Sequence, residues 1–135
     1  MNFKNKVIVI TGASSGIGEA SAIKFAKKNA KIVLVARRKE KLLQLQKKLI
    51  KFTDSTLVCQ CDVSNKTQVK EMTDIVLDTF GRIDVLINNA GFVIYGKVSE
   101  LSIEEIESQM ETNYFGMIYC TKNFLPHMIE QGKGH

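Results

Sequence analysis

The chain has 135 residues, 44% of them hydrophobic and 24% charged, and a formal net charge of +5. This length fits one domain of ordinary size, and this composition is typical of a globular chain and excludes an intrinsically disordered one. The first apolar run breaks at Thr11 and Gly12, too early for a secretion signal or a membrane-spanning helix, so no membrane partner is expected.

The excess of basic residues has two explanations, a polyanionic partner or an ordinary soluble surface. Several lysines fall around the polar side of one predicted helix: Lys39, Lys41, Lys47, Lys48 and Lys51. No aromatic residues interleave with them to stack bases, and no zinc-binding spacing is present. A solvated helix face is therefore favoured over nucleic-acid binding.

The cysteines, Cys59, Cys61 and Cys120, are odd in number and lack the spacing of a disulfide framework. They indicate a reducing compartment, so a cytoplasmic protein is expected. Cys59 and Cys61 lie two residues apart in a strand-like run, which places both on one face, and they are interpreted as small core residues. No metal site is predicted, because further ligands are lacking nearby.

Short apolar, β-branched runs alternate with stretches of helical periodicity along the whole chain. The strands are expected, in chain order, at residues 7–10, 31–36, 56–60 and 83–87. The helices that follow them carry these apolar positions: Ala22, Phe25, Ala26 and Ala30; Leu42, Leu45, Leu49 and Phe52; Val69, Met72, Val76 and Phe80; Ile106, Met110, Met117, Cys120, Phe124 and Met128. The alternation predicts an α/β fold, a doubly wound parallel sheet with helices on both faces, in a single domain over residues 1–135.

Three helix ends have recognisable signals. Ser64 is a suitable N-cap for the helix before Gly81, and this glycine ends it. Ser102 and Glu105 form a capping box that opens one long final helix.

A glycine-rich turn joins the first strand to the first helix. It consists of Gly12, Ala13, Ser14, Ser15, Gly16, Ile17 and Gly18. A turn in this place exposes backbone N–H groups at a helix N-terminus, where the helix dipole favours an anion. Gly12 permits the tight turn, Gly16 lets a pyrophosphate approach the backbone, and Gly18 lets the helix pack closely. A phosphate site is favoured over an ordinary glycine turn.

Four features in order resemble the short-chain dehydrogenase/reductase family: Thr-Gly-x-x-x-Gly-x-Gly from Thr11, Asp62-Val63 after the third strand, Asn88-Asn89-Ala90-Gly91 after the fourth, and Asn113 in the last helix. The resemblance implies a Rossmann-type sheet, here truncated after the helix that follows strand four. It also implies a nicotinamide cofactor, a small carbonyl or alcohol substrate, and hydride transfer between them.

The end of the second strand bears on the choice of cofactor. An acidic residue there would bond the adenosine ribose and repel a 2′-phosphate, but the chain has Arg37 and Arg38. A guanidinium can hold a phosphate through two parallel hydrogen bonds, so NADP(H) is predicted over NAD(H). The alternative is that both are surface charges of a basic helix. Many NADP-preferring relatives carry a basic residue where this chain has Ser15, whose hydroxyl, with that of Ser14, could still bond a phosphate or ribose oxygen.

The resemblance also assigns roles at the ends of the third and fourth strands. Asp62 is expected to meet the adenine amino group and the Val63 backbone the ring, although Asp62 alone could equally be a turn residue. Asn89, Ala90 and Gly91 are expected beside the cofactor ribose, with Asn89 tying strand ends together.

Asn113 falls on the apolar seam of the last helix, where a buried amide needs hydrogen-bond partners. The resemblance implies that it bonds backbone and a water of the proton relay, and it is the one catalytic residue predicted here. The alternative is a satisfied core asparagine that kinks the helix.

The family's catalytic serine, tyrosine and lysine are expected beyond His135. Tyr119 is followed three residues later by Lys122, but this pair is interpreted as a coincidence because it lies on the helix that Asn113 marks. Without a fifth strand, the edge formed by residues 85–87 is expected to stand open. The resemblance further implies homo-oligomer contacts through the last helix if the protein is full length.

The sequence thus favours the cofactor-binding part of an NADP(H)-dependent oxidoreductase, with no turnover expected from this chain alone. The alternative is a non-catalytic nucleotide-binding sensor or interaction protein. A basic nucleic-acid-binding domain is supported by charge only.

Overall fold

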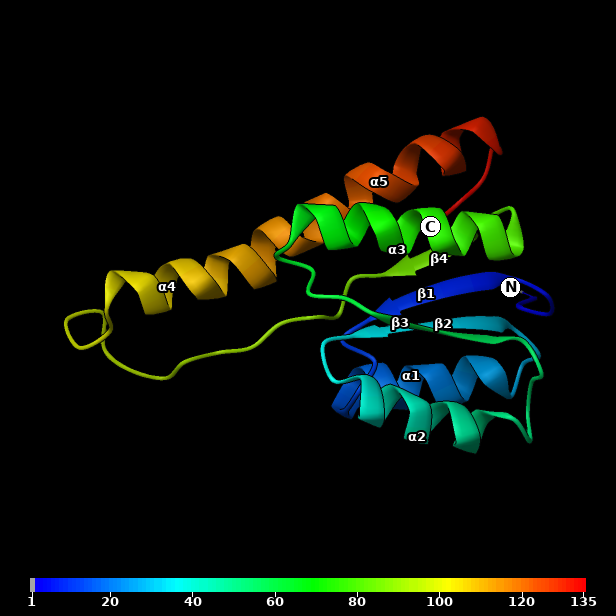
Figure 1. Cartoon of the computed structure of the whole chain (residues 1–135), viewed down its shortest axis with the longest axis horizontal. Coiled ribbons are helices and arrows are strands. Elements are labelled where there is room, and N and C mark those ends of the chain that lie inside the picture. Colours follow the sequence, from blue (N-terminus) through cyan, green and yellow to red (C-terminus); the bar gives the residue numbers. More distant parts are fainter. Residues whose placement is uncertain (1) are drawn as a thin grey trace.

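A computed structural model describes residues 2–135 as a parallel sheet between two layers of helices (Figure 1). The strands are β1 (Val7–Thr11), β2 (Lys31–Ala36), β3 (Thr56–Gln60) and β4 (Val85–Ile87). The helices are α1 (Gly16–Ala26), α2 (Lys39–Leu49), α3 (Lys66–Phe80), α4 (Ile103–Met110), the π-helical segment η1 (Glu111–Phe115) and α5 (Gly116–Glu130). All strand pairs are parallel, which confirms the predicted α/β fold class.

The strand order is β3-β2-β1-β4. The chain builds outward from β1 through β2 to β3, and then crosses to the other side of β1 to add β4. The order of the strands therefore reverses between β1 and β4, and ligands of open α/β sheets bind outside the carboxyl ends of the strands at such a reversal.

Alternate side chains of the central strands enter two separate cores. Val7 and Val9 face α3 and α5, whereas Ile8 and Ile10 face α1 and α2. All four side chains are fully buried. Continuous β-branched runs, without polar alternation, are what a parallel strand covered on both faces requires.

β4 starts two residues later than the sequence indicates. The N–H of Val7, at the start of β1, donates to the Asp84 carboxylate at 3.0 Å, and the Asp84 N–H donates to the Val7 carbonyl. The side chain thus takes the place of a ladder partner, and the regular pairing of β4 with β1 begins only at Val85.

The outer edge of β4 is not fully open, contrary to the expectation for residues 85–87. The His135 N–H donates to the Asp84 carbonyl at 3.0 Å, and the Leu86 N–H donates to the His135 carbonyl at 2.8 Å. This is the pattern of a parallel bridge, with His135 opposite Val85. The Gln131 side chain also bonds both the N–H and the carbonyl of Ile83.

The capping box at the start of α4 is confirmed, since the Ser102 hydroxyl accepts from the Glu105 N–H and the Glu105 carboxylate accepts from the Ser102 N–H. Gly81 ends α3 in a left-handed conformation with φ of 67°, as predicted. The prediction for the start of α3 is wrong by one residue. Asn65 is the N-cap and accepts from the Gln68 N–H, because the Ser64 hydroxyl donates instead to Asp62.

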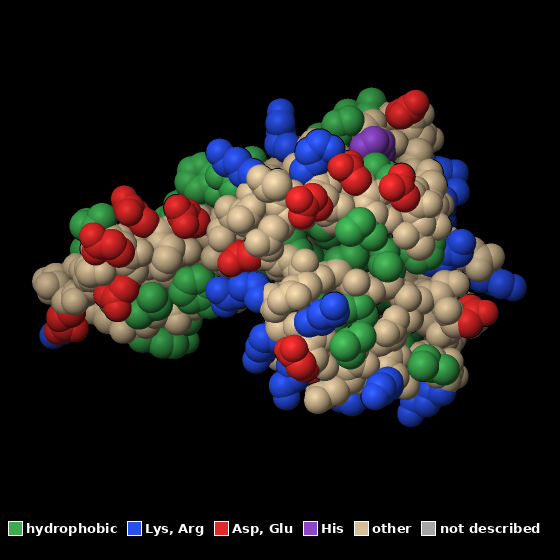
Figure 2. Space-filling model, in the orientation of Figure 1, with side chains coloured by type: hydrophobic (Ala, Val, Ile, Leu, Met, Phe, Trp, Pro, Cys, Tyr) green, Lys and Arg blue, Asp and Glu red, His purple; other side chains and the backbone are tan. Residues whose placement is uncertain are grey.

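The last helix is continuous but contains a π-helical segment, and its α4 end projects beyond the sheet (Figure 1). The predicted apolar seam is only partly buried. Cys120 and Phe124 are fully buried, whereas Met110 is 48% and Met117 39% exposed. No other described helix or strand covers the part of the helix around Met110 and Met117. Figure 2 shows hydrophobic and acidic side chains together along the projecting α4 end.

Asp84 also makes the most buried ionic contact described in residues 2–135. Its carboxylate is 5% exposed and accepts from the Lys6 ammonium at 3.0 Å and from the Arg82 guanidinium, in addition to the Val7 N–H. Burial alone would raise the pKa of Asp84, but the bonds from Arg82, Val7 and Lys6 together outweigh it and hold this pKa below its usual value.

We expect Asp84→Asn to lower the free energy of unfolding at neutral pH by about 2 kcal/mol, because the amide fills the same space without the charge-assisted bonds. A carboxyl with a lowered folded-state pKa stabilises the fold above its unfolded pKa of about 3.9, and this contribution is lost as the pH falls through the folded-state pKa. The free energy of unfolding, measured with urea at about pH 7 and about pH 3, should therefore differ less between wild type and variant at the lower pH. The exposed Asp54→Asn serves as control, and an equal difference at both pH values would contradict this account.

Candidate functional site

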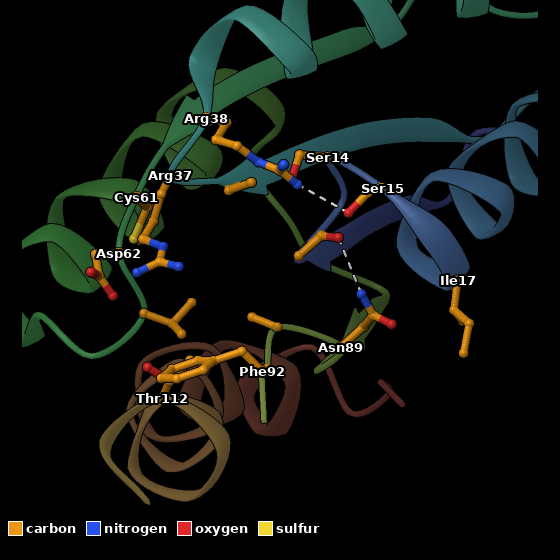
Figure 3. Close-up of a pocket in the computed structure, with 15 residues that line it drawn as sticks. Ser14, Ser15, Ile17, Arg37, Arg38, Cys61, Asp62, Asn89, Phe92 and Thr112 are labelled. Carbon is orange, nitrogen blue, oxygen red and sulfur yellow. Dashed lines mark hydrogen bonds between the residues drawn. The ribbon is translucent and has the colours of Figure 1, made fainter. Parts of the chain in front are cut away.

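The carboxyl ends of the strands and the turn before α1 surround a cavity of about 410 Å³ (Figure 3). Its walls come from four segments that each follow a strand, and from the π-helical segment. The lining residues are Gly12, Ser14, Ser15, Ile17, Ala36, Arg37, Arg38, Cys61, Asp62, Val63, Asn89, Ala90, Gly91, Phe92 and Thr112. Of the residues predicted to bind the cofactor, Ala13, Gly16 and Gly18 do not line the cavity directly.

The glycine turn is shaped by contacts that leave no room for side chains at two of its positions. A Cβ on Gly12 would lie 2.8 Å from the Ala90 Cα, and φ at Gly12 is +66°. A Cβ on Gly18 would overlap the Gly12 carbonyl and the Asn89 side chain. Ala13 is fully buried, and its N–H donates to the Val35 carbonyl at 3.1 Å.

Gly16 differs from the other two glycines. Its φ is +56°, yet a Cβ there would meet nothing within 4 Å. The residue starts α1, and Ser15 before it makes no capping bond to the first turn of the helix. The backbone at this helix N-terminus is thus accessible, and its orphan N–H groups and the helix dipole make it a place for an anion.

Arg38 is held across the mouth of the turn. Its guanidinium donates to the Ser14 hydroxyl at 2.9 Å and to the Ser15 hydroxyl at 3.1 Å. Arg37 points the other way, toward Cys61 and Asp62 (Figure 3). Within residues 2–135, neither arginine forms an ion pair. Two positive charges therefore line the cavity outside any described ion pair, although the Asp62 carboxylate lines the same cavity.

Asp62 is a turn residue whose side chain also faces the cavity. One of its carboxylate oxygens accepts from the Ser64 N–H at 3.0 Å and from the Ser64 hydroxyl at 2.7 Å, as in a turn. The side chain also lines the cavity, next to Val63. Its own N–H donates to the Gln68 side chain, so the segment is fixed by the start of α3.

The hydroxyl of Thr11 joins the glycine turn to the segment after β4. It donates to the Ile87 carbonyl at 3.2 Å and accepts from the N–H groups of Asn89 and Ala90, both at 3.0 Å. The Asn89 side-chain amide returns the link by donating to the carbonyls of Thr11 and Gly12. Asn89 therefore ties the two strand ends together, in the manner expected of it.

Asn113 lies in the π-helical segment and is exposed, so the expectation that it is buried is wrong. Its side-chain carbonyl nevertheless accepts from the Phe92 N–H at 2.9 Å, and its amide donates to the Phe92 carbonyl at 2.7 Å. The hydrogen-bond demand of the amide is met by the loop after β4 and not by a helical core. π-Helical segments often occur at functional sites, where they direct a side chain away from the regular helical position.

Sequence reasoning missed several residues at the site. Thr11 was predicted only as the first residue of the glycine motif that follows the strand, yet its hydroxyl makes three hydrogen bonds there. Phe92 and Thr112 line the cavity without any spacing signal. A polar side chain inside an otherwise apolar buried strand was the available signal for Thr11, because a buried hydroxyl needs partners.

The cysteines are buried, as expected. Burial raises the pKa of Cys59 to about 11 and the pKa of Cys120 to about 12. The pKa of Cys61 is also raised to about 12, first by burial and then by the nearby Cys120 and Asp62. These thiols are protonated at neutral pH and are poor nucleophiles. No cluster of three metal-ligating side chains occurs in the part of the chain that the structure describes.

Comparisons with known proteins agree with this geometry. A family model described as short chain dehydrogenase matches residues 6–135. An uncharacterised oxidoreductase of Staphylococcus aureus strain USA300 is 41% identical over 131 residues, which are 97% of this chain and 56% of that protein. This chain thus spans little more than half the length of the curated relative.

Two solved structures of similar proteins contain cofactor. A metagenomic short-chain oxidoreductase in complex with NADP has a TM-score of 0.94 and 32% identity, over 100% of this chain and 61% of that one. L-Sorbose reductase from Gluconobacter frateurii, complexed with NADPH and L-sorbose, has a TM-score of 0.93 and 35% identity, over 99% of this chain and 52% of that one.

We expect Thr11→Val to lower the free energy of unfolding by about 2 kcal/mol, because the substitution keeps the shape but leaves the N–H groups of Asn89 and Ala90 without their acceptor. Hydrogen exchange at these two amides should accelerate more than at Val9 in the middle of the strand. Thr11→Ser keeps the hydroxyl and is the matched control. Equal amide exchange in the Val and Ser variants would show that the hydroxyl does not hold this segment.

Proposed function

This chain belongs to the short-chain dehydrogenase family, and we propose that it is the NADP(H)-binding part of an oxidoreductase. The proposed reaction is hydride transfer between the nicotinamide and the carbon of a small carbonyl or alcohol substrate. The observation that carries the proposal is one cavity in which an accessible helix N-terminus and two arginines without carboxylate partners face the same space.

The pyrophosphate of the cofactor is proposed to bind at the glycine turn. Gly16 leaves open space at the first turn of α1, and the helix dipole adds positive potential there. Gly12 and Gly18, by contrast, serve the turn itself, because their missing side chains let α1 and the loop after β4 come together. This division of roles supports the proposed pyrophosphate site.

The 2′-phosphate of NADP(H) is proposed to bind in contact with Arg37 or Arg38. The serine hydroxyls that hold Arg38 fix its guanidinium in place, so less side-chain freedom is lost on binding. Ser14 and Ser15 would then support the arginine as well as contact the ligand. The two similar structures described above are complexes with NADPH and with NADP, and they favour NADP(H) as the cofactor of this chain.

When bound, the cofactor supplies or accepts the hydride, and the chain's own residues bind and orient it. Asp62 and Val63 are proposed at the adenine, and Asn89, Ala90 and Gly91 near the ribose. Asn113 is proposed to act at the reacting end, where it fixes the Phe92 backbone with two hydrogen bonds.

The 135-residue polypeptide alone is proposed to have no reductase turnover. Its tyrosines, Tyr95, Tyr114 and Tyr119, do not line the cavity, and the ring of Tyr119 lies 5.2 Å from the Lys66 ammonium instead. Their absence from the cavity lining supports the proposal, because a general acid must reach the substrate. An NADPH-dependent rate with a carbonyl compound would overturn this part of the proposal.

We further propose a cytoplasmic location and, for the whole protein, homo-oligomer contacts through the exposed apolar side of α4, η1 and α5. Tyr114, Phe115, Leu125 and Ile129 are exposed along this helix, and an apolar surface of this kind commonly marks a protein interface. Among residues 2–135, no helix combines the length and the apolarity needed to cross a bilayer. Neither a membrane nor a nucleic acid is proposed as a partner.

We expect Arg37→Asp to reduce the preference for NADPH over NADH by about 10- to 100-fold, because a charge-assisted bond to the 2′-phosphate is replaced by repulsion. The ratio of the two dissociation constants, measured by the fluorescence of the reduced nicotinamide or by calorimetry, gives the effect. Lys39→Asp makes the same change in charge two residues away, outside the cavity, and corrects for long-range electrostatics. An Arg37→Asp ratio no different from that of the Lys39 control would refute the assignment of the 2′-phosphate.

A further inference from the structure

Gly116, the first residue of α5, stands against one wall of the cavity. A Cβ at this position would lie 2.6 Å from the Val63 Cγ2 and 3.1 Å from its Cβ. Val63 is 5% exposed and lines the cavity after β3. Any side chain at Gly116 must therefore displace Val63 or move the helix away from it.

The same stretch of helix also contacts the opposite wall. Asn113 bonds both backbone groups of Phe92, and a Cβ on Gly91 would lie 3.0 Å from the Asn113 Oδ1. Both Gly91 and Phe92 line the cavity. Residues three apart on this helix thus support two segments that follow different strands, β3 and β4.

The π-helical segment explains how these contacts are made together. The Gly116 N–H donates to the Glu111 carbonyl, five residues earlier, so the backbone makes one wider turn. In a regular α-helix, residues three apart lie on the same side. The wider turn separates the directions of Asn113 and Gly116, and each meets a different wall of the cavity.

We infer that Gly116 is a positioning residue: its missing side chain sets the place of Val63 and thereby the width of the adenine end of the cavity. The inference rests on the proposed dinucleotide site and identifies what fixes one part of it. Gly116 itself does not line the cavity, so it acts only through Val63.

The test separates the two ends of the ligand in the folded 135-residue chain. 2′,5′-ADP probes the adenosine end and inorganic pyrophosphate probes the glycine turn, each titrated while the backbone amide NMR signals of Gly12, Gly16 and Val63 are followed. We expect Gly116→Ala to weaken 2′,5′-ADP binding by about tenfold or more and to leave pyrophosphate binding within about twofold of wild type. Met117→Ala, on the next residue of the helix, should change neither.

Rescue gives a second readout. Val63→Ala removes the Cγ2 atom that the new methyl group would overlap and leaves only the milder contact with the Cβ at 3.1 Å. In this background, adding Gly116→Ala should therefore change 2′,5′-ADP affinity by less than about threefold. If Gly116→Ala alone gives no folded chain, the comparison of Val63→Ala with the double variant decides. A further loss of about tenfold in 2′,5′-ADP affinity in the double variant would overturn the inference. Equal losses of both probes in a folded Gly116→Ala chain, or no loss of either, would also overturn it. A wild-type chain that binds neither probe would instead contradict the proposed function.

Discussion

The turn after β1 lies against the segment after β4 so closely that no side chain fits between them. Gly12 and Gly18 occupy this contact, and the Thr11 hydroxyl and the Asn89 amide fasten it with hydrogen bonds from both sides. The order of the strands reverses between β1 and β4. This contact therefore also fixes the place where the segments that follow these two strands separate. The position of the cavity, the direction of α1 and the accessibility of Gly16 all depend on it.

Charge and backbone geometry act together at this edge of the sheet. The cavity offers helix-terminal N–H groups at one end and guanidinium groups beside them, while the carboxylate of Asp62 is engaged with Ser64. The arginines come directly after β2, so the parallel register of β1 and β2 brings them level with the glycine turn. A ligand with several phosphate charges matches this arrangement, and a neutral ligand would leave both charges unpaired.

Much of this organisation could be predicted from the sequence, because strand periodicity, glycine placement and the basic pair are local signals. The bounds of β2 and β3 and the capping box at Ser102 agree with expectation. The failures arose where a side chain competes with backbone pairing or where the helix geometry changes. Asp84 shortened β4, Asp62 took the hydroxyl of Ser64 away from helix capping, and the π-helical segment placed Asn113 outside the core. Periodicity assumes regular geometry and regular partners, so it cannot anticipate these cases.

A crystal structure of the chain soaked with NADP⁺ tests most directly whether the phosphates of NADP(H) bind at this edge of the sheet. We expect density for the pyrophosphate beside Gly16 at the start of α1 and for the 2′-phosphate in contact with Arg37 or Arg38. A fully occupied ligand bound at any other surface, or bound in this cavity with its 2′-phosphate turned away from both arginines, would contradict the account.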